Sequence, residues 1–265
     1  MMARELRGTR RGWQPWVAVI AGALLVGGVV PAGAVPTPKG CLAKKVKAWG
    51  KLRQCQATAN GKRLKGKTSD LAGCQKKFDE KIAKLSKEAA AATIACRYQI
   101  NGDGTVTDYD TGLQWEQKTN DGGVHDRKNR YTWNTTSGGT APDGTAFTDF
   151  LGTLDNGASA GLTAGVTTIS GCFAGHCDWR LPSLVELETI VDPSTPGCRS
   201  VGVACMDQTT FGPTPTRPRV VVYWSATTFA DFPSGAWFVI FDQGGGANVG
   251  NKHDAKYVRA VRTVL

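Results

Sequence analysis

Eight cysteines are the residues of this 265-residue chain that could take part in the widest range of chemistry. Cysteines can hold a metal, act as nucleophiles or pair as disulfides. They fall into two groups of four: Cys41, Cys55, Cys74 and Cys96, then Cys172, Cys177, Cys198 and Cys205. Which chemistry they carry depends on the compartment, because thiols oxidise outside the cytoplasm and stay reduced within it.

The first 34 residues have the pattern of an export signal. Arginines precede an uncharged run from Trp16 to Val30. Ala32-Gly33-Ala34 follows the run and is a motif that a signal peptidase cuts. The run of 15 residues is shorter than the ~20 that a spanning helix needs, which disfavours an uncleaved anchor. We expect cleavage near Ala34 and a secreted, periplasmic or envelope location. Arg10-Arg11 leaves twin-arginine export as the alternative to the general secretory route.

In an oxidising compartment the cysteines are expected to form four disulfides, which leaves no thiol for catalysis or zinc. The pairs Cys172–Cys177 and Cys198–Cys205 would each close a short loop. His176 lies beside the first pair, but Cys-x4-Cys is a weak zinc spacing. The chain has no Gly-x-Ser-x-Gly motif, and its three histidines lie in loop-like stretches. We therefore predict no catalytic residue, no metal and no cofactor.

A calcium loop is the other metal hypothesis. The stretch from 99 to 110 repeats part of a twelve-residue calcium loop at Gln99, Asn101, Asp103, Gly104, Thr105 and Asp110. Glutamine stands first where aspartate is expected, and aspartate stands last where a bidentate glutamate is usual. A polar turn between two short strands is the interpretation that we adopt.

The charge of the chain divides at about residue 97. Residues 41–97 hold fifteen basic and four acidic residues, a net charge of +11, whereas residues 98–265 have a net charge of −5. Helix-forming residues dominate the first segment, while glycine, threonine and β-branched residues dominate the second. We therefore expect a signal peptide over 1–34, a basic helical hairpin over 35–97 and a separate domain over 98–265.

Apolar residues in the basic segment follow helical spacing. One stripe comprises Leu71, Cys74, Phe78, Ile82, Leu85, Ala89, Ala92 and Cys96, preceded by the capping residues Ser69 and Asp70. An earlier helix would bury Leu42, Val46, Trp49 and Leu52 and stop near Asn60-Gly61.

The cysteine spacing predicts how the two helices are joined. Fourteen helical residues rise ~21 Å, so Cys41 and Cys55 cannot bridge each other. Antiparallel helices instead allow Cys55–Cys74 near the turn and Cys41–Cys96 at the open end. Because the two axial spans differ by roughly 12 Å, we expect part of residues 41–50 to be extended, with a break at Gly50.

The basic side chains of this segment form a candidate polyanion-binding surface. Its residues are Lys44, Lys45, Lys47, Lys51, Lys62, Arg63, Lys65, Lys67, Lys76, Lys77, Lys81 and Lys84. A solvated helix face, an assembly element and a spacer are the alternatives. Aromatic residues are not interleaved with the lysines, so sequence-specific nucleic-acid binding is unsupported.

The C-terminal segment predicts an α+β domain with many loops. Helical spacing at Phe147, Phe150, Leu151 and Leu154 indicates one helix, and Ser183 with Glu186 forms a capping box that opens another. Ala236 to Phe241 is expected to be a strand buried on both faces, and Tyr257 to Val264 a closing strand.

Four motifs of this segment resemble the C-terminal domain of the collagen-like adhesin (Lcl) family. They are NGDGTVTDYDTGLQWEQ (101–117), DWRLPSLVELETIVD (178–192), YWSATT (223–228) and AWFVIFDQGG with KYVRAVR (236–262). The resemblance implies a C-type-lectin-like domain, related to the formylglycine-generating enzyme fold, with short twisted strands and two helices. Some members of this family are adhesins that recognise sulfated polysaccharide or host surfaces. Trp179 is expected to anchor the core, and Arg180 to donate hydrogen bonds beside the Ser183 helix.

The chain is therefore expected to be an exported bacterial protein without enzymatic activity. Its C-terminal domain would recognise a carbohydrate or protein ligand, while the hairpin contacts anionic envelope polymer. It would be peripheral to a membrane at most. An enzyme of the formylglycine-generating superfold with an unrecognised site, and a purely structural envelope protein, remain as alternatives.

Overall fold

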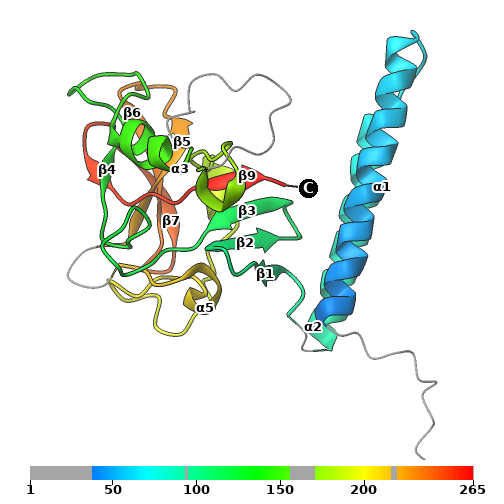
Figure 1. Ribbon diagram of the computed structural model, residues 1–265, viewed down its shortest axis with the longest axis horizontal. Coiled ribbons are helices and arrows are strands. Elements are labelled where there is room, and N and C mark those ends of the chain that lie inside the picture. The colour runs from blue at the N-terminus through cyan, green and yellow to red at the C-terminus, as the bar shows by residue number, and fades with distance from the viewer. Residues whose placement is uncertain (1–37, 93–94, 156–170, 216–219, 265) are drawn as a thin grey trace, which may run out of the picture. The chain divides into compact units, whose positions relative to one another are not determined.

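The computed structural model describes residues 38–92, 95–155, 171–215 and 220–264. The predicted export signal lies outside the described residues. Pro36–Leu265 form one compact unit that contains both a helical hairpin and a mixed domain of short strands and helices. The hairpin consists of α1 (Pro38–Leu64) and α2 (Leu71–Ala91), which overlap in the view of Figure 1 and pack against each other through a shared core.

The second helix forms where the sequence predicts it. Asp70 is its N-cap, and the carboxylate accepts a hydrogen bond from the Gly73 N–H at 2.8 Å. The predicted apolar stripe is buried at Cys74, Phe78, Ile82, Leu85 and Ala89. It packs on α1, where the ring of Trp49 lies 4.3 Å from that of Phe78.

The first helix differs from the prediction because it has no break. It is helical through Gly50 and through Asn60-Gly61 and ends at Leu64. The Cys74–Cys96 span is shortened instead. Because α2 ends at Ala91, Cys96 lies in the chain beyond the helix and is not held at the axial distance that a continued helix would give. Both bridges then have Cα atoms 5.8 Å apart.

The buried face of α1 also differs from the predicted one. Cys41, Lys45, Ala48, Leu52 and Ala59 are buried, whereas Val46 is 44% exposed. These positions keep helical spacing only if a lysine belongs to the apolar stripe. The prediction counted only apolar residues, so it wrongly placed Val46 in the buried face and left out Lys45.

The C-terminal domain contains three small antiparallel sheets. The first has the order β1-β2-β3-β9, the second β4-β8 and the third β5-β6-β7. The strands are β1 (Tyr98–Ile100), β2 (Thr105–Asp108), β3 (Leu113–Glu116), β4 (Tyr131–Thr132), β5 (Val222–Thr228), β6 (Gly235–Ile240), β7 (Gly246–Asn251), β8 (Ala255–Lys256) and β9 (Val261–Thr263). Because β9 comes from the end of the chain, it completes a sheet that the first strands of the domain begin.

The helical segments of this domain are short. They are a π-helix (Ala146–Leu151) continuing into α3 (Gly152–Leu154), a 3-10 turn (Phe173–Gly175), α4 (Leu184–Glu188) and α5 (Gln208–Phe211). This is more than the two helices expected. The closing strand is also shorter than expected, since only Val261–Thr263 pairs. The prediction of an α+β domain preceded by a disulfide-linked hairpin agrees with these elements.

Buried aromatic residues fill two adjoining cores of the domain. Trp115 lies in one, while Trp179 and Trp224 lie in the other, all at most 3% exposed. Trp237 is only partly buried and packs edge-on against Phe229, so β6 is not buried on both faces. Trp179 thus anchors the core as expected.

Asp155 gives the domain a specific pH dependence. It is 3% exposed and accepts the Trp179 N–H, and burial raises the pKa of Asp155 to about 6. The folded state therefore binds more protons than the unfolded state between about pH 4 and 6, so this residue adds stability as the pH falls from 7 to 4.5. We expect Asp155→Asn to raise the free energy of unfolding at pH 7 by up to about 3 kcal/mol. Denaturant titrations of the wild type and of Asp155→Asn at pH 7 and 4.5 measure the effect. The prediction fails if the difference between their free energies of unfolding is the same at both pH values.

Candidate functional site

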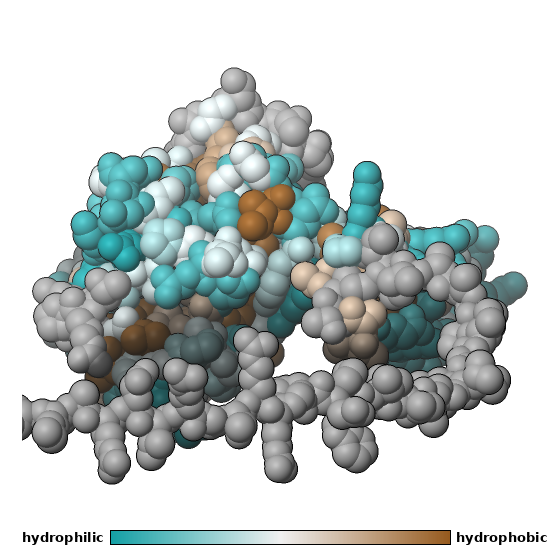
Figure 2. Space-filling view, turned by 90° about the horizontal axis from the view of Figure 1, so that it is seen from below, coloured by the Kyte–Doolittle hydropathy of each residue, from teal (hydrophilic) through white to brown (hydrophobic). Residues whose placement is uncertain are grey.

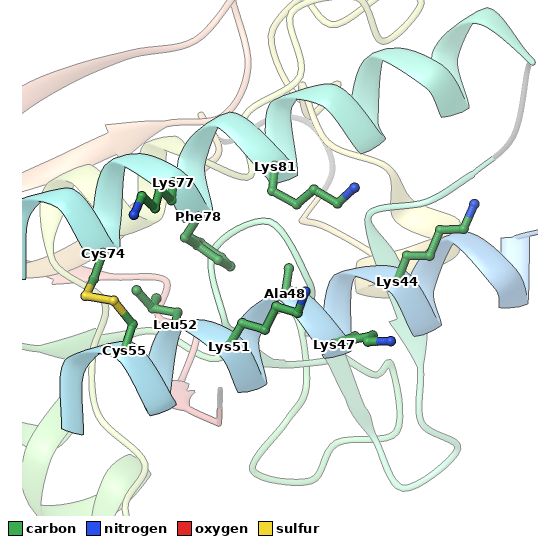
Figure 3. A pocket seen from close by; sticks show the side chains of 10 residues that line it. All are labelled: Lys44, Lys47, Ala48, Lys51, Leu52, Cys55, Cys74, Lys77, Phe78 and Lys81. Carbon is green, nitrogen blue, oxygen red and sulfur yellow. A yellow bond between two sulfur atoms is a disulfide. The ribbon is translucent and has the colours of Figure 1, made fainter. Parts of the chain in front are cut away.

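A groove of about 530 Å³ lies between the two helices of the hairpin (Figure 3). Its apolar floor consists of Ala48 and Leu52 from α1, Phe78 from α2 and the Cys55–Cys74 disulfide. Five lysines complete the lining: Lys44, Lys47, Lys51, Lys77 and Lys81. We call this site the lysine groove.

Helical geometry explains why these side chains meet. Lys44, Lys47 and Lys51 are spaced by three and four residues, so they share one side of α1 beside the buried Ala48 and Leu52. Lys77 and Lys81 hold the equivalent positions on α2 beside Phe78. Two helices cover each other along one line of contact only. The groove follows the flank of this contact, where Ala48, Leu52 and Phe78 are each at most 7% exposed and exposed lysines line both edges.

The lysine groove is strongly cationic. None of its ten lining residues is acidic. The five lysines come from both helices, as Figure 3 shows, so their electrostatic fields add along the groove. Lysine stems can also cover apolar surface while their charged ends remain in water. Such an arrangement attracts anions and offers their apolar parts a contact surface.

Most of the predicted polyanion-binding residues are exposed on the hairpin. A recess that adjoins the lysine groove shares Lys51 and Lys77 and adds Lys62, together with the acidic Asp70. The others are exposed outside the lysine groove, at Arg63, Lys65, Lys67, Lys76 and Lys84. The face of the molecule seen in Figure 2 is mostly hydrophilic in its coloured parts, with apolar residues gathered in small patches.

Lys45 is the exception, and its assignment to the polyanion-binding surface is wrong. Its side chain is 1% exposed and forms an ion pair with Asp110, and it donates a hydrogen bond to Ser86 Oγ at 2.9 Å. Two further contacts join α1 to the mixed domain: Trp49 Nε1 donates to the Tyr109 carbonyl at 3.0 Å, and Arg53 donates to the Val264 carbonyl at 2.9 Å. Lys45 therefore attaches the hairpin to the domain and cannot meet a polymer.

The cysteines form the same four pairs that the sequence predicts. Cys41 bonds to Cys96, Cys55 to Cys74, Cys172 to Cys177, and Cys198 to Cys205, which accounts for all eight. Their sulfur atoms are thus engaged with one another.

The remaining predicted residues stabilise local structure. In the turn between β1 and β2, Asp103 accepts hydrogen bonds from the Thr105 N–H and hydroxyl. Ser183 and Glu186 form the predicted capping box. Arg180 makes two hydrogen bonds of 2.7 Å to the Glu186 carboxylate, a bidentate pair that holds the start of α4 against the preceding strand-like segment.

Sequence reasoning missed a buried charged cluster in the mixed domain. Glu116 is fully buried, and its Oε1 lies 2.7 Å from both Lys118 Nζ and His125 Nδ1. Its Oε2 accepts the Ala260 N–H at 2.9 Å, while the Arg259 guanidinium donates to the Glu116 and Phe211 carbonyls. We call these four residues, Glu116, Lys118, His125 and Arg259, the Glu116 cluster.

The electrostatics of the Glu116 cluster are those of a structural ion network. Burial alone would raise the pKa of Glu116, but Lys118 and His125 outweigh it and lower that pKa below its usual range. Lys118 also lies 4.5 Å above the Phe150 ring, and His125 stacks on Phe173. A signal was present in the sequence: Glu116 and Lys118 are two residues apart in an extended segment, which places them on one face.

Comparison with known proteins identifies only the mixed domain. The family model of the Lcl C-terminal domain matches residues 104–262, which leaves the hairpin and the lysine groove outside the match. No curated protein and no solved structure matched the chain. Among the residues that the structure describes, no helix is both long and apolar enough to cross a membrane.

Proposed function

Because the chain belongs to the Lcl C-terminal domain family, we propose that it is an adhesin-like binding protein that acts outside the cytoplasm without enzymatic activity. Its hairpin binds anionic polymer, such as an acidic polysaccharide of the cell envelope. Its C-terminal domain, which we take to be C-type-lectin-like, presents its loops to a carbohydrate or protein ligand. Four disulfides support this location, since they persist in oxidising compartments.

One observation carries the proposed polymer binding: the exposed lysines of both helices are almost without acidic partners. The only ion pair within the described part of the hairpin joins Lys84 to Glu88 at 3.9 Å, and both side chains are exposed. Exposed pairs of this kind contribute little. The lysine charges therefore remain available to a polyanion, which gains affinity by releasing its counterions.

The absence of enzymatic activity is also part of the proposal. A thiol-dependent reaction of the formylglycine-generating type needs a free cysteine, and all eight are bonded. This observation favours binding over catalysis.

We expect the mature protein to be retained on immobilised heparin and to elute earlier when lysines are removed. Two variants each lose five charges. One is K44Q/K47Q/K51Q/K77Q/K81Q in the lysine groove. The other is K65Q/K67Q/K76Q/K84Q/K87Q outside it, which includes Lys87, a further exposed lysine of α2. Each should reduce the salt dependence of log K by roughly 0.7 per lysine, because a polymer uses exposed charges on all sides of the hairpin.

The control replaces the second set of five lysines by arginine, which keeps the charge and should keep the retention. Elution of the wild-type protein at the same salt concentration as the glutamine variants would refute polymer binding by the hairpin.

A further inference from the structure

We infer that the lysine groove binds the monomer of an acidic phospholipid, with the acidic headgroup on the lysines and an acyl chain on the apolar floor. This inference rests on the proposed function, in which the hairpin faces anionic ligands, and specifies the ligand of one part of its surface. Lipid binding would differ from polymer binding because the ligand would contact the apolar floor of the lysine groove as well as the lysine charges.

The floor is the first observation. Ala48, Leu52 and Phe78 lie between two rows of lysines, and the Cys55–Cys74 disulfide continues the apolar surface. Because Ala48, Leu52 and Phe78 are at most 7% exposed, the stems of the lysines extend the apolar surface that a ligand meets. A polysaccharide gains little from such a surface, whereas an acyl chain would lose contact with water along it. The groove volume of about 530 Å³ lies within the range of small-molecule sites.

The charge around the floor is the second observation. An apolar groove alone could be covered by a neutral partner or by a second copy of the chain. Here five lysines and no acidic residue line it, so two copies meeting through this groove would bring like charges together. The complementary ligand must combine negative charge with an apolar part. An acidic phospholipid has both within one molecule.

The two-helix architecture is the third observation. The disulfide holds Cys55 and Cys74 with Cα atoms 5.8 Å apart, and Trp49 and Phe78 pack farther along the same helix pair. These contacts fix the separation of the two lysine rows. A groove held open in this way can accept a chain without reorganisation of the backbone, which lowers the cost of binding.

Calorimetry on the mature protein tests the inference with three probes below their micelle concentrations. The probes are dodecyl phosphate, which has charge and chain, inorganic phosphate, which has charge only, and dodecyl maltoside, which has a chain only. We expect one dodecyl phosphate to bind per protein, at least tenfold more tightly than either other probe. Binding of dodecyl phosphate no tighter than that of inorganic phosphate would overturn the inference.

Variants separate this site from general polyanion binding. The lysine-groove variant K44Q/K47Q/K51Q/K77Q/K81Q should bind dodecyl phosphate at least tenfold more weakly, while the variant outside the groove should stay within about twofold of the wild type. Equal losses in both would contradict a site. Because heparin retention is expected to fall equally in both, polymer binding can fail or succeed independently of this result.

The floor is tested by Ala48→Met, which adds a flexible apolar side chain without a change of charge. We expect dodecyl phosphate affinity to fall at least fivefold and heparin retention to stay unchanged. Sedimentation of the ligand-free wild type and of this variant completes the test. A monomer in both supports the inference, whereas a wild-type dimer that Ala48→Met dissociates would show that a second copy covers the groove.

Discussion

Glu116→Gln should lower the free energy of unfolding by about 3 to 5 kcal/mol at pH 7. The substitution removes the carboxylate that lies 2.7 Å from the buried Lys118 ammonium and so leaves that charge without its direct partner. It also weakens the contacts to His125 and to the Ala260 N–H. Denaturant unfolding followed by far-UV circular dichroism measures the loss.

The pH dependence of this effect has a definite sign. The pKa of Glu116 is lower in the folded state than in the unfolded state, where it is about 4.3. The ionised carboxylate therefore contributes its full stabilisation above about pH 4.3, and this stabilisation is lost as the pH falls through the pKa of the folded state. The difference between wild type and Glu116→Gln should therefore shrink below about pH 4.

An ion pair whose carboxylate is exposed provides the control for Glu116. Asp254 lies 3.4 Å from Lys256 but is 59% exposed, so Asp254→Asn should cost less than about 1 kcal/mol. Adding Lys118→Met to Glu116→Gln should recover part of the loss, because the uncompensated charge is then removed. A loss under 1 kcal/mol in Glu116→Gln alone would mean that water, rather than the Glu116 cluster, compensates Lys118.

Removal of the Cys41–Cys96 disulfide is the second change with a large expected effect. This bond closes a loop of 55 residues, and the chain-entropy relation gives about 4 kcal/mol for a loop of that length. The hairpin has a small core of its own, so we expect Cys41→Ser/Cys96→Ser to open it locally. Hydrogen exchange of the α1 and α2 amides should accelerate strongly while that of β5 and β6 changes little.

The short disulfide in the mixed domain is the control for this experiment. Cys172 and Cys177 are five residues apart, for which the same relation gives about 2 kcal/mol. Cys172→Ser/Cys177→Ser should leave exchange in the hairpin unchanged. If exchange in α1 and α2 were unaffected by loss of Cys41–Cys96, contacts such as Lys45–Asp110 would have to hold the hairpin instead.

Those contacts also bear on function. Lys45, Trp49 and Arg53 lie on one helix and reach Asp110, a backbone carbonyl beside it and the carbonyl of Val264. The lysine groove and the mixed domain are therefore parts of one compact unit. In the proposed function, one compact unit would carry both the hairpin that binds a polymer or lipid and the domain that meets the second ligand.

Features that depend on local geometry could be predicted from the sequence. The disulfide pairs follow from helical rise, which forbids Cys41–Cys55 and leaves the antiparallel pairing. The Ser183–Glu186 capping box, the apolar stripe of α2 and the family motifs of the C-terminal domain likewise depend on residues close together in the chain. Each of these can be recognised because the spacing of neighbours fixes which side chains can meet.

Which charged residues are buried could be seen only in the folded chain. Lys45 looks like one more surface lysine until Asp110, 65 residues away, supplies its partner. Glu116 meets Lys118 nearby but needs His125 and the distant Ala260 N–H to complete its hydrogen bonds. The lysine groove itself exists only where two helices leave their flanks uncovered. A charge can be buried only where other groups compensate it, and folding brings many of these groups together from distant parts of the chain. The spacing of residues along one helix or strand does not reveal such distant partners.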